Sequence, residues 1–503
     1  MKKILYLSLV FFAVCSSCKS YLDINEDPNS PSASVITADI VMPGAEMNFA
    51  ASYGSSFRIP AGYYTQHYAH QFGTSNYVSY SQFEQSATRS SSGYSQFMRA
   101  IANFETVIEK AKDSEAYATV LAATCLRAMS FEAMVDVYGS IPYTEALDPA
   151  NVSPKYDEGL TVYEGLIAEL TEAIENTKKA TNKTVCKNFL FESGNYEDWI
   201  RFANALKLRM LTRISGVSNA DAELGNLIRE NNFPTKDVAY TSCWGTEAGN
   251  MNPFYSEEFA TNFGSTQINV VANMALIATM QITDAEGNIL FTDGRLPKFF
   301  EKNGSGKYFG GLSGTNNSTA SGFSTATFCR PVASPKMPLS LISVAEVEFF
   351  ISEYYAKKND AANANLHYEN AIKASFNSCE AEGADEYLAR YPMDINNYKE
   401  VLGIAKWVAL SGVDNFEAYN EMRRLRYPAM GSVKGEDIWA GSGQYTMDLM
   451  VPGVLYTPYQ VYSSVGVGNI LERWPYAEAS SSRNSNCPKF TNADFTKKIF
   501  FAN

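Results

Sequence analysis

Residues 361–375 read AANANLHYENAIKAS, and this stretch indicates the fold more directly than any other part of the chain. Ala364, Tyr368 and Ala371 recur at the spacing of one helix face. Small residues let two helices approach closely where they cross, and an aromatic ring fills the gap beside the crossing. The preceding residues, about 339–357, are also helical in pattern, so 335–375 is predicted to form a pair of helices.

The spacing in 361–375 is that of tetratricopeptide helices, which stack in pairs and bury a shared core. Helical periodicity also covers Ala118 to Tyr138, Tyr163 to Ile174 and Trp199 to Arg213. We therefore predict a mostly α protein with tetratricopeptide-like helical pairs at about 98–215 and 335–428. The basic side chains of the third helix are expected to be solvated or salt-bridged: Lys207, Arg209 and Arg213.

Two segments have a different composition, rich in Gly, Asn, Ser, Thr and aromatic residues. They span about 219–335 and 428–503. Long irregular segments are uncommon in compact domains unless they have a function. We predict that both form a packed, loop-rich and irregular subdomain that carries the ligand face, within a single domain at 46–503.

The N-terminus has the pattern of a secretory signal. Lys2 and Lys3 precede an apolar run that is shorter than the roughly 20 residues a membrane-spanning helix needs. Small serines then precede Cys18, as at a bacterial lipoprotein processing site. We predict a signal peptide at 1–17, lipidation of Cys18, and a lipidated tether at 18–45. The alternative is ordinary signal cleavage, which would leave Cys18 as a plain thiol.

Composition and motifs exclude several classes of function. The 503 residues carry a net charge of −13 without a basic stripe, which argues against nucleic-acid binding. This acidity can also serve solubility alone. Cysteines outside the N-terminal segment are far apart, and only His67, His70 and His367 are present. Signatures of zinc sites, phosphate loops and serine hydrolases are missing, so we predict no metal, no cofactor and no catalytic residues.

Several blocks of the sequence occur in an order that resembles one known family. The chain is similar to the SusD/RagB-like outer-membrane lipoproteins of Bacteroidota, and closest in character to a SusD-like subgroup with shorter loops. The blocks that carry this resemblance are Ser17-Cys18, Leu22 to Asn25, Asp27 to Asn29, Leu126 to Tyr143, Trp199 to Arg213, Ser343 to Val347, Lys406-Trp407, Glu417-Ala418 and Arg423 to Pro428.

The resemblance implies a fold, a location and a partner. It implies a tetratricopeptide-containing helical fold, lipid-anchored at the surface of the outer membrane. It implies a SusC-like TonB-dependent transporter, over which the lipoprotein acts as a hinged lid for nutrient uptake. Family ligands are usually oligosaccharides, although some members handle peptides, and the family is not catalytic.

A sugar site needs flat aromatic rings for stacking and polar side chains for hydrogen bonds. Two loop segments fit this requirement, and similar general regions serve the family. The candidate ligand-binding residues are Asn76, Tyr77, Tyr80, Gln82, Trp244, Asn252 and Tyr255. The alternative interpretation is that these rings fill the core or contact the transporter. Trp199, Trp407 and Trp474 lie in helical or family-pattern blocks and are expected to be packing residues.

Two other functions remain as alternatives. A glycoside hydrolase would need two carboxylates about 5–10 Å apart across a cleft. The 54 Asp and Glu residues do not forbid such a pair, but no acidic motif stands out. A tetratricopeptide scaffold that contacts only protein would differ from a nutrient-binding protein mainly in having no ligand at the aromatic loops.

Overall fold

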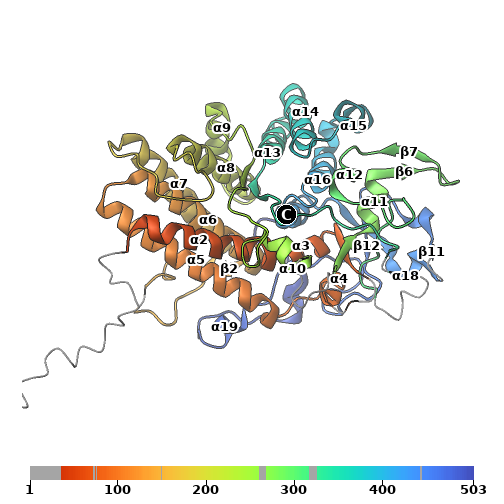
Figure 1. The fold of residues 1–503 in the computed structure, drawn as a ribbon, viewed down its shortest axis with the longest axis horizontal. Coiled ribbons are helices and arrows are strands. Elements are labelled where there is room, and N and C mark those ends of the chain that lie inside the picture. Colours follow the sequence, from red (N-terminus) through yellow and green to blue (C-terminus); the bar gives the residue numbers. More distant parts are fainter. Residues whose placement is uncertain are drawn as a thin grey trace, which may run out of the picture.

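The computed structural model describes most of the chain, and the protein is mostly helical (Figure 1). This confirms the predicted fold class. The predicted signal peptide and Cys18 lie outside the described residues. The structure describes residues 36–502 except 72–73, 75, 149, 260–267, 316–323, 325 and 442–443.

The folded part begins earlier than predicted. Helix α2 starts at Ala38, and its Met42 and Ala45 are fully buried. The tether was predicted to end at residue 45, which lies inside this core helix. Its end therefore has to be placed before Ala38. The chain continues from α2 (Ala38–Ala51) through a π-helix (Ser52–Phe57) into α3 (Arg58–Tyr64), β1 (Tyr68–His70) and α4 (Val78–Ser81).

The first helical group follows the periodicity of the sequence. Among the described residues, α6 is the one helix whose length and hydropathy would suit a membrane span. However, 94% of its apolar window is buried against other helices, so it is a core helix. Cys125 on α6 is a fully buried thiol. The group consists of α5 (Ala87–Asp113), α6 (Tyr117–Tyr138), α7 (Gly159–Lys179), α8 (Tyr196–Ile214) and α9 (Asp221–Glu230).

The second helical group contains the pair predicted from residues 361–375. One prediction about it was wrong, because 339–342 form strand β8 and the helix begins only at Val344. Ser343 caps this helix, since its hydroxyl accepts from Glu346 N at 3.1 Å while Glu346 accepts from Ser343 N at 3.2 Å. The group consists of α13 (Val344–Lys357), α14 (Ala361–Ser378), α15 (Ala384–Arg390), a short 3-10 helix (Ile395–Asn397), α16 (Tyr398–Ala409) and α17 (Asn415–Leu425).

The remaining segments form short helices and two-stranded sheets. Strands β4 and β8 pair antiparallel and join the two ends of the loop-rich segment, while β9 and β12 pair in parallel. The other pairs, all antiparallel, are β1–β5, β2–β3, β6–β7 and β10–β11.

These segments have the following bounds. The strands are β2 (Ser140–Ile141), β3 (Asp157–Glu158), β4 (Val238–Tyr240), β5 (Val270–Ala272), β6 (Gln281–Thr283), β7 (Ile289–Thr292), β8 (Leu339–Ile342), β9 (Ala429–Lys434), β10 (Trp439–Gly441), β11 (Gln444–Tyr445) and β12 (Val454–Thr457). The helices are α10 (Pro253–Glu258), α11 (Met274–Met280), α12 (Leu296–Phe299), α18 (Gly435–Ile438) and α19 (Glu478–Ser481), with 3-10 helices at Met447–Leu449 and Asn492–Thr496.

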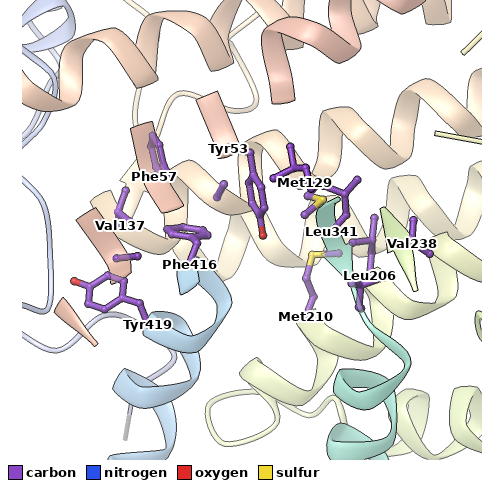
Figure 2. Packing of buried hydrophobic residues seen from close by; sticks show 14 of the residues in the cluster. Tyr53, Phe57, Met129, Val137, Leu206, Met210, Val238, Leu341, Phe416 and Tyr419 are labelled. Atoms are coloured by element: carbon purple, nitrogen blue, oxygen red, sulfur yellow. The ribbon is translucent and has the colours of Figure 1, made fainter. Parts of the chain in front are cut away.

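A hydrophobic core runs between the two helical groups (Figure 2). Tyr53 and Phe57 of the π-helix meet Phe416 of α17, with ring centroids 5.7 and 5.5 Å apart. Edge-to-face contacts of this kind stabilise aromatic cores beyond the burial of area alone. The predicted packing residues Trp199, Trp407 and Trp474 are all at most 1% exposed, which confirms their role.

Buried charges link the same helices. Of the two expected arrangements for the basic side chains of α8, solvated or salt-bridged, the structure shows the second: Arg209 and Arg213 are almost fully buried and paired with carboxylates. Arg209 donates two hydrogen bonds, of 2.6 and 3.0 Å, to the carboxylate of Glu132 of α6. Arg213 donates to Asp136 of α6 at 2.8 Å and also pairs with Glu417 of α17. A guanidinium group has five N–H donors, so one buried arginine can pair with several carboxylates at once.

The ion pairs extend into the second helical group. Arg424 of α17 binds Glu353 of α13 at 2.5 Å, and Lys406 of α16 binds Glu421 of α17 at 2.7 Å. Burial alone would raise the pKa of Glu421, but Arg424 and Lys406 hold that pKa well below its usual range. These side chains, from Glu132 to Arg424, form one buried ionic network across α6, α8, α13, α16 and α17.

Removal of one buried arginine should make the protein much easier to unfold. We expect Arg213→Met to lower the free energy of unfolding by roughly 3–5 kcal/mol, because it leaves the buried carboxylate of Asp136 without a cationic partner. Arg201→Met on the same helix is the control, since Arg201 is one-third exposed and pairs with exposed Glu197 and half-buried Asp198. That variant should change stability by less than about 1 kcal/mol. Urea unfolding followed by tryptophan fluorescence measures both; equal effects would contradict a structural role for the network.

Candidate functional site

The β1–β5 sheet positions the first predicted ligand-binding segment. Tyr68 lies opposite Ala272, and just beyond the sheet Gln71 N donates to Asn269 O at 2.7 Å. Exposed Asn76 then donates from its side-chain amide to Asn269 Oδ1 at 3.1 Å. Asn76 is thus held at the surface beside the end of the sheet, with polar groups still turned to solvent.

Tyr77 and Tyr80 form a stacked pair at this surface. Their rings are 5.6 Å apart and 15° from parallel, and both are half-buried. Tyr77 adopts a left-handed backbone with φ +63°, which starts the single turn of α4. Fully buried Tyr63 of α3 lies beneath the pair, 5.7 Å from Tyr77 and 6.2 Å from Tyr80. The pair therefore rests on a rigid aromatic base.

A second aromatic pair lies on α10. Tyr255 stacks on Phe259 with centroids 5.5 Å apart and planes 14° from parallel, and both rings are half-buried. Glu258 belongs to the same segment as the second pair, and its carboxylate faces the Tyr77 hydroxyl of the first pair. We call the four residues Tyr77, Tyr80, Tyr255 and Phe259 the aromatic face.

Two predicted ligand contacts are structural residues instead. Trp244 is only 7% exposed, and its indole N–H donates to Tyr240 O at 3.0 Å. Asn252 is fully buried and caps α10, because its side chain accepts from Phe254 N at 2.9 Å and donates to Met337 O at 3.0 Å. Neither can reach a ligand at the surface, which corrects the prediction for both.

Gln82 joins α4 to the C-terminal segment. Its side-chain amide donates to Gln460 Oε1 at 3.0 Å, and its backbone carbonyl accepts from Tyr462 N at 2.7 Å. The side chain is half-buried, so it remains partly accessible. Asn76, Tyr77, Tyr80, Gln82 and Tyr255 stay predicted ligand contacts.

Glu258 is the unusual group of this region. It is fully buried, and neither carboxylate oxygen forms a hydrogen bond of normal geometry within the described residues. Burial raises its pKa to about 8, while the nearby Tyr77 hydroxyl lowers that pKa and Glu257 raises it. Neutral Glu258 can therefore support the aromatic face at neutral pH without placing a charge beneath it.

The charges at the aromatic face are largely neutralised. The Arg89 guanidinium lies 5.9 Å above the Tyr80 ring, and it also pairs with Glu84 at 3.3 Å and Ser79 Oγ at 2.8 Å. Half-buried rings bordered by amides and hydroxyls, with paired charges, suit a neutral ligand that has both apolar faces and hydroxyl groups.

The histidines serve the framework. His67 lies between Asn415 Nδ2 at 2.8 Å and Trp407 O at 2.9 Å, and burial lowers its pKa to about 3. His70 lies in β1, and burial lowers its pKa to about 4. Within the described ranges, no three His, Cys, Asp or Glu side chains are grouped to hold a metal ion.

Sequence reasoning missed Phe259 and Glu258. Phe259 follows Tyr255 by four residues, which is the spacing of neighbours on one helix face. The Asn-Pro pair at 252–253 marks a helix start and could have indicated α10. The burial of Glu258 depends on α3 and α4, which are distant in sequence, so no local signal predicts it.

Comparison with known proteins identifies the family. Residues 29–442 match the SusD-like sequence family described as starch-binding and associating with the outer membrane. The chain belongs to the SusD-like family. The family description places the SusD-like protein among starch-binding proteins that associate with the outer membrane. No curated protein matches the chain significantly.

Solved structures share the fold at low sequence identity. A SusD homolog from Bacteroides uniformis is 20% identical with a TM-score of 0.72, and the alignment covers 92% of this chain and all of that one. A protein named as chitin-binding is 19% identical with a TM-score of 0.66, over 90% and 94% of the two chains. A Bacteroidetes SusD-like structure is 16% identical with a TM-score of 0.70, over 93% and 99%.

The buried carboxyl of Glu258 should make stability depend on pH. Its pKa is raised on folding, so the folded state binds the proton more tightly, and stability falls as pH rises from about 4.5 towards about 8. We expect Glu258→Gln to remove this loss, which amounts to at most about 1.4 kcal/mol per pH unit. Urea unfolding at several pH values tests this.

Glu257→Gln is the matched control, because Glu257 is the exposed neighbour on the same helix. Its unfolding free energy should still fall as pH rises, because burial, the main cause of the raised pKa of Glu258, is unchanged. If Glu258→Gln also followed the wild type, Glu258 would be charged in the folded protein, and its role as a neutral support would be refuted.

Proposed function

We propose that this SusD-like protein captures oligosaccharides at the cell surface through the aromatic face and delivers them to a SusC-like TonB-dependent transporter. The observation that carries the proposal is the half-buried Tyr77–Tyr80 stack, held on buried Tyr63 beside Tyr255 and Phe259. Rings fixed in advance lose little conformational freedom when a ligand binds.

The chemistry of the aromatic face favours a glycan. Sugar rings have apolar C–H faces that stack on tyrosine, and their hydroxyls pair with amides such as Asn76 and Gln82. The family description as starch-binding and the similar structure named as chitin-binding support the same ligand class. Peptide is the alternative ligand, since peptides also contain apolar groups and hydrogen-bonding amides.

The predicted lipid anchor would hold the aromatic face near a transporter. Cys18 would carry the acyl chains, and residues between Cys18 and α2 would link them to the folded domain. A membrane-attached protein meets a membrane partner at a high effective concentration, which favours transfer of a captured ligand.

The alternatives predict different results. A hydrolase would need two accessible carboxylates across the site, whereas Glu258 is fully buried. Release of reducing ends from a bound oligosaccharide would nevertheless favour it. A pure tetratricopeptide scaffold would bind no glycan at all, and its function would depend on the helical pairs alone.

Loss of the tyrosine stack should weaken glycan binding. We expect Tyr77→Ala combined with Tyr80→Ala to lower affinity for the best oligosaccharide of a starch and chitin panel by about 10–100-fold, because two stacking surfaces are removed. Affinity gels and isothermal titration measure this. Tyr355→Ala is the control, since Tyr355 stacks on His367 of the second helical group, 5.5 Å away. Unchanged binding by the double variant, or binding of peptides only, would reject the proposal.

Removal of Cys18 should release the protein from the membrane. In cells that process bacterial lipoproteins, we expect Cys18→Ser to appear in the soluble fraction while the wild type sediments with outer membranes. Cys15→Ser is the matched control and should stay membrane-bound, because Cys15 is predicted to leave with the signal peptide. Membrane attachment of the Cys18→Ser protein would contradict lipidation at that residue.

A further inference from the structure

A pocket of about 320 Å³ lies beside α10, and none of the four aromatic-face residues lines it. It is formed where β1, β4, β8, the end of α14 and the loop at 411–413 come together. Phe254 of α10 lines it, while the next residue, Tyr255, belongs to the aromatic face. The pocket and the aromatic face therefore border the same helix.

One wall of the pocket is aromatic. Tyr68 and Phe254 stack with centroids 5.8 Å apart and planes 22° from parallel, and Phe300 meets Tyr68 edge-on at 6.5 Å. All three side chains are at most 4% exposed, so packing fixes their positions. A fixed aromatic wall offers a stacking surface to an apolar ring face.

The buried part of the pocket also carries hydroxyl groups that lack partners. Ser411 is fully buried and Ser340 is 6% exposed. Neither Oγ atom has a hydrogen-bond partner anywhere in the described part of the chain. Buried polar atoms are nearly always paired in proteins, so two unpaired hydroxyls lining one pocket indicate a ligand that supplies the missing hydrogen bonds.

The charges indicate that this ligand is neutral. The charged residues that line the pocket are Asp237 and Lys298, which have opposite signs, and both lie at its exposed rim. The buried lining contains aromatic, aliphatic and hydroxyl groups but no charge within the described residues. An unpaired charge would be unfavourable at such a position.

We propose that this pocket binds one neutral sugar ring, with a C–H face against Tyr68 and Phe254 and with ring hydroxyls bonded to Ser340 and Ser411. Its volume is at the lower end of the roughly 300–1,000 Å³ that is usual for ligand pockets, which suits one ring rather than a chain. The pocket shares no lining residue with the aromatic face, although the Phe254 and Phe259 rings lie 5.9 Å apart, so the two sites can be tested with different variants.

The test is a titration of the full mature protein with D-glucose, D-galactose and N-acetyl-D-glucosamine, followed by ligand-observed NMR. We expect saturable binding of at least one sugar. Ser340→Ala combined with Ser411→Ala should weaken it by about tenfold, since two hydrogen bonds are lost. These substitutions remove no hydrogen bond from the free protein, so its melting temperature should not fall.

Two further variants keep the test specific. Thr212→Val removes a buried, unpartnered hydroxyl on α8 outside the pocket and should leave sugar affinity unchanged. Thr241→Trp places a large ring at the exposed rim and should abolish binding without disturbing the core.

The proposal fails if none of the three sugars binds saturably, or if the double serine variant binds as well as the wild type. It also fails if a charged probe such as acetate binds the pocket in place of sugar. Tyr77→Ala combined with Tyr80→Ala should retain monosaccharide binding. Loss of binding in that variant would assign the sugar to the aromatic face and overturn the second site.

Discussion

Arg209 and Arg213 of α8 are removed from water and held by carboxylates of α6 and α17. Buried ions are costly unless nearly every partner is in place, so these helices can pack in few other arrangements. Arg424 and Lys406 extend the same constraint to α13 and α16. The buried ionic network thus fixes the first helical group against the second, and the hydrophobic core around Tyr53 and Phe416 fills the space between them.

The aromatic face is connected to this network through α17. Asp414 caps α17 and accepts from the Tyr53 hydroxyl at 2.7 Å, while Asn415 donates to His67 at 2.8 Å. These bonds hold the segment that contains α3 and β1, on which the Tyr77–Tyr80 pair rests. Through these bonds the large core holds the small aromatic face in a fixed position. This arrangement also suits the proposed glycan ligand, because neutral sugars bind through shape and stacking, which depend on fixed rings.

The sequence predicted the helices well because their signals are local. Ala364 and Tyr368 show helical spacing wherever the chain folds, and α14 forms as expected. The site was predicted only in part, because exposure depends on distant segments. Trp244 and Asn252 have suitable chemistry for a ligand, but β4 and Met337 bury them. Likewise, no local pattern shows that Glu132 pairs with an arginine of another helix, although the family blocks contain both residues.

The central claim is that a preformed aromatic face on this helical scaffold receives the glycan. A crystal structure of the protein with its best-binding oligosaccharide tests this claim most directly. We predict a sugar ring stacked on Tyr77 or Tyr80, with Asn76 or Gln82 bonded to its hydroxyls and the backbone of α4 and α10 unchanged. An oligosaccharide bound elsewhere on the surface, with no contact to these tyrosines, would contradict the account.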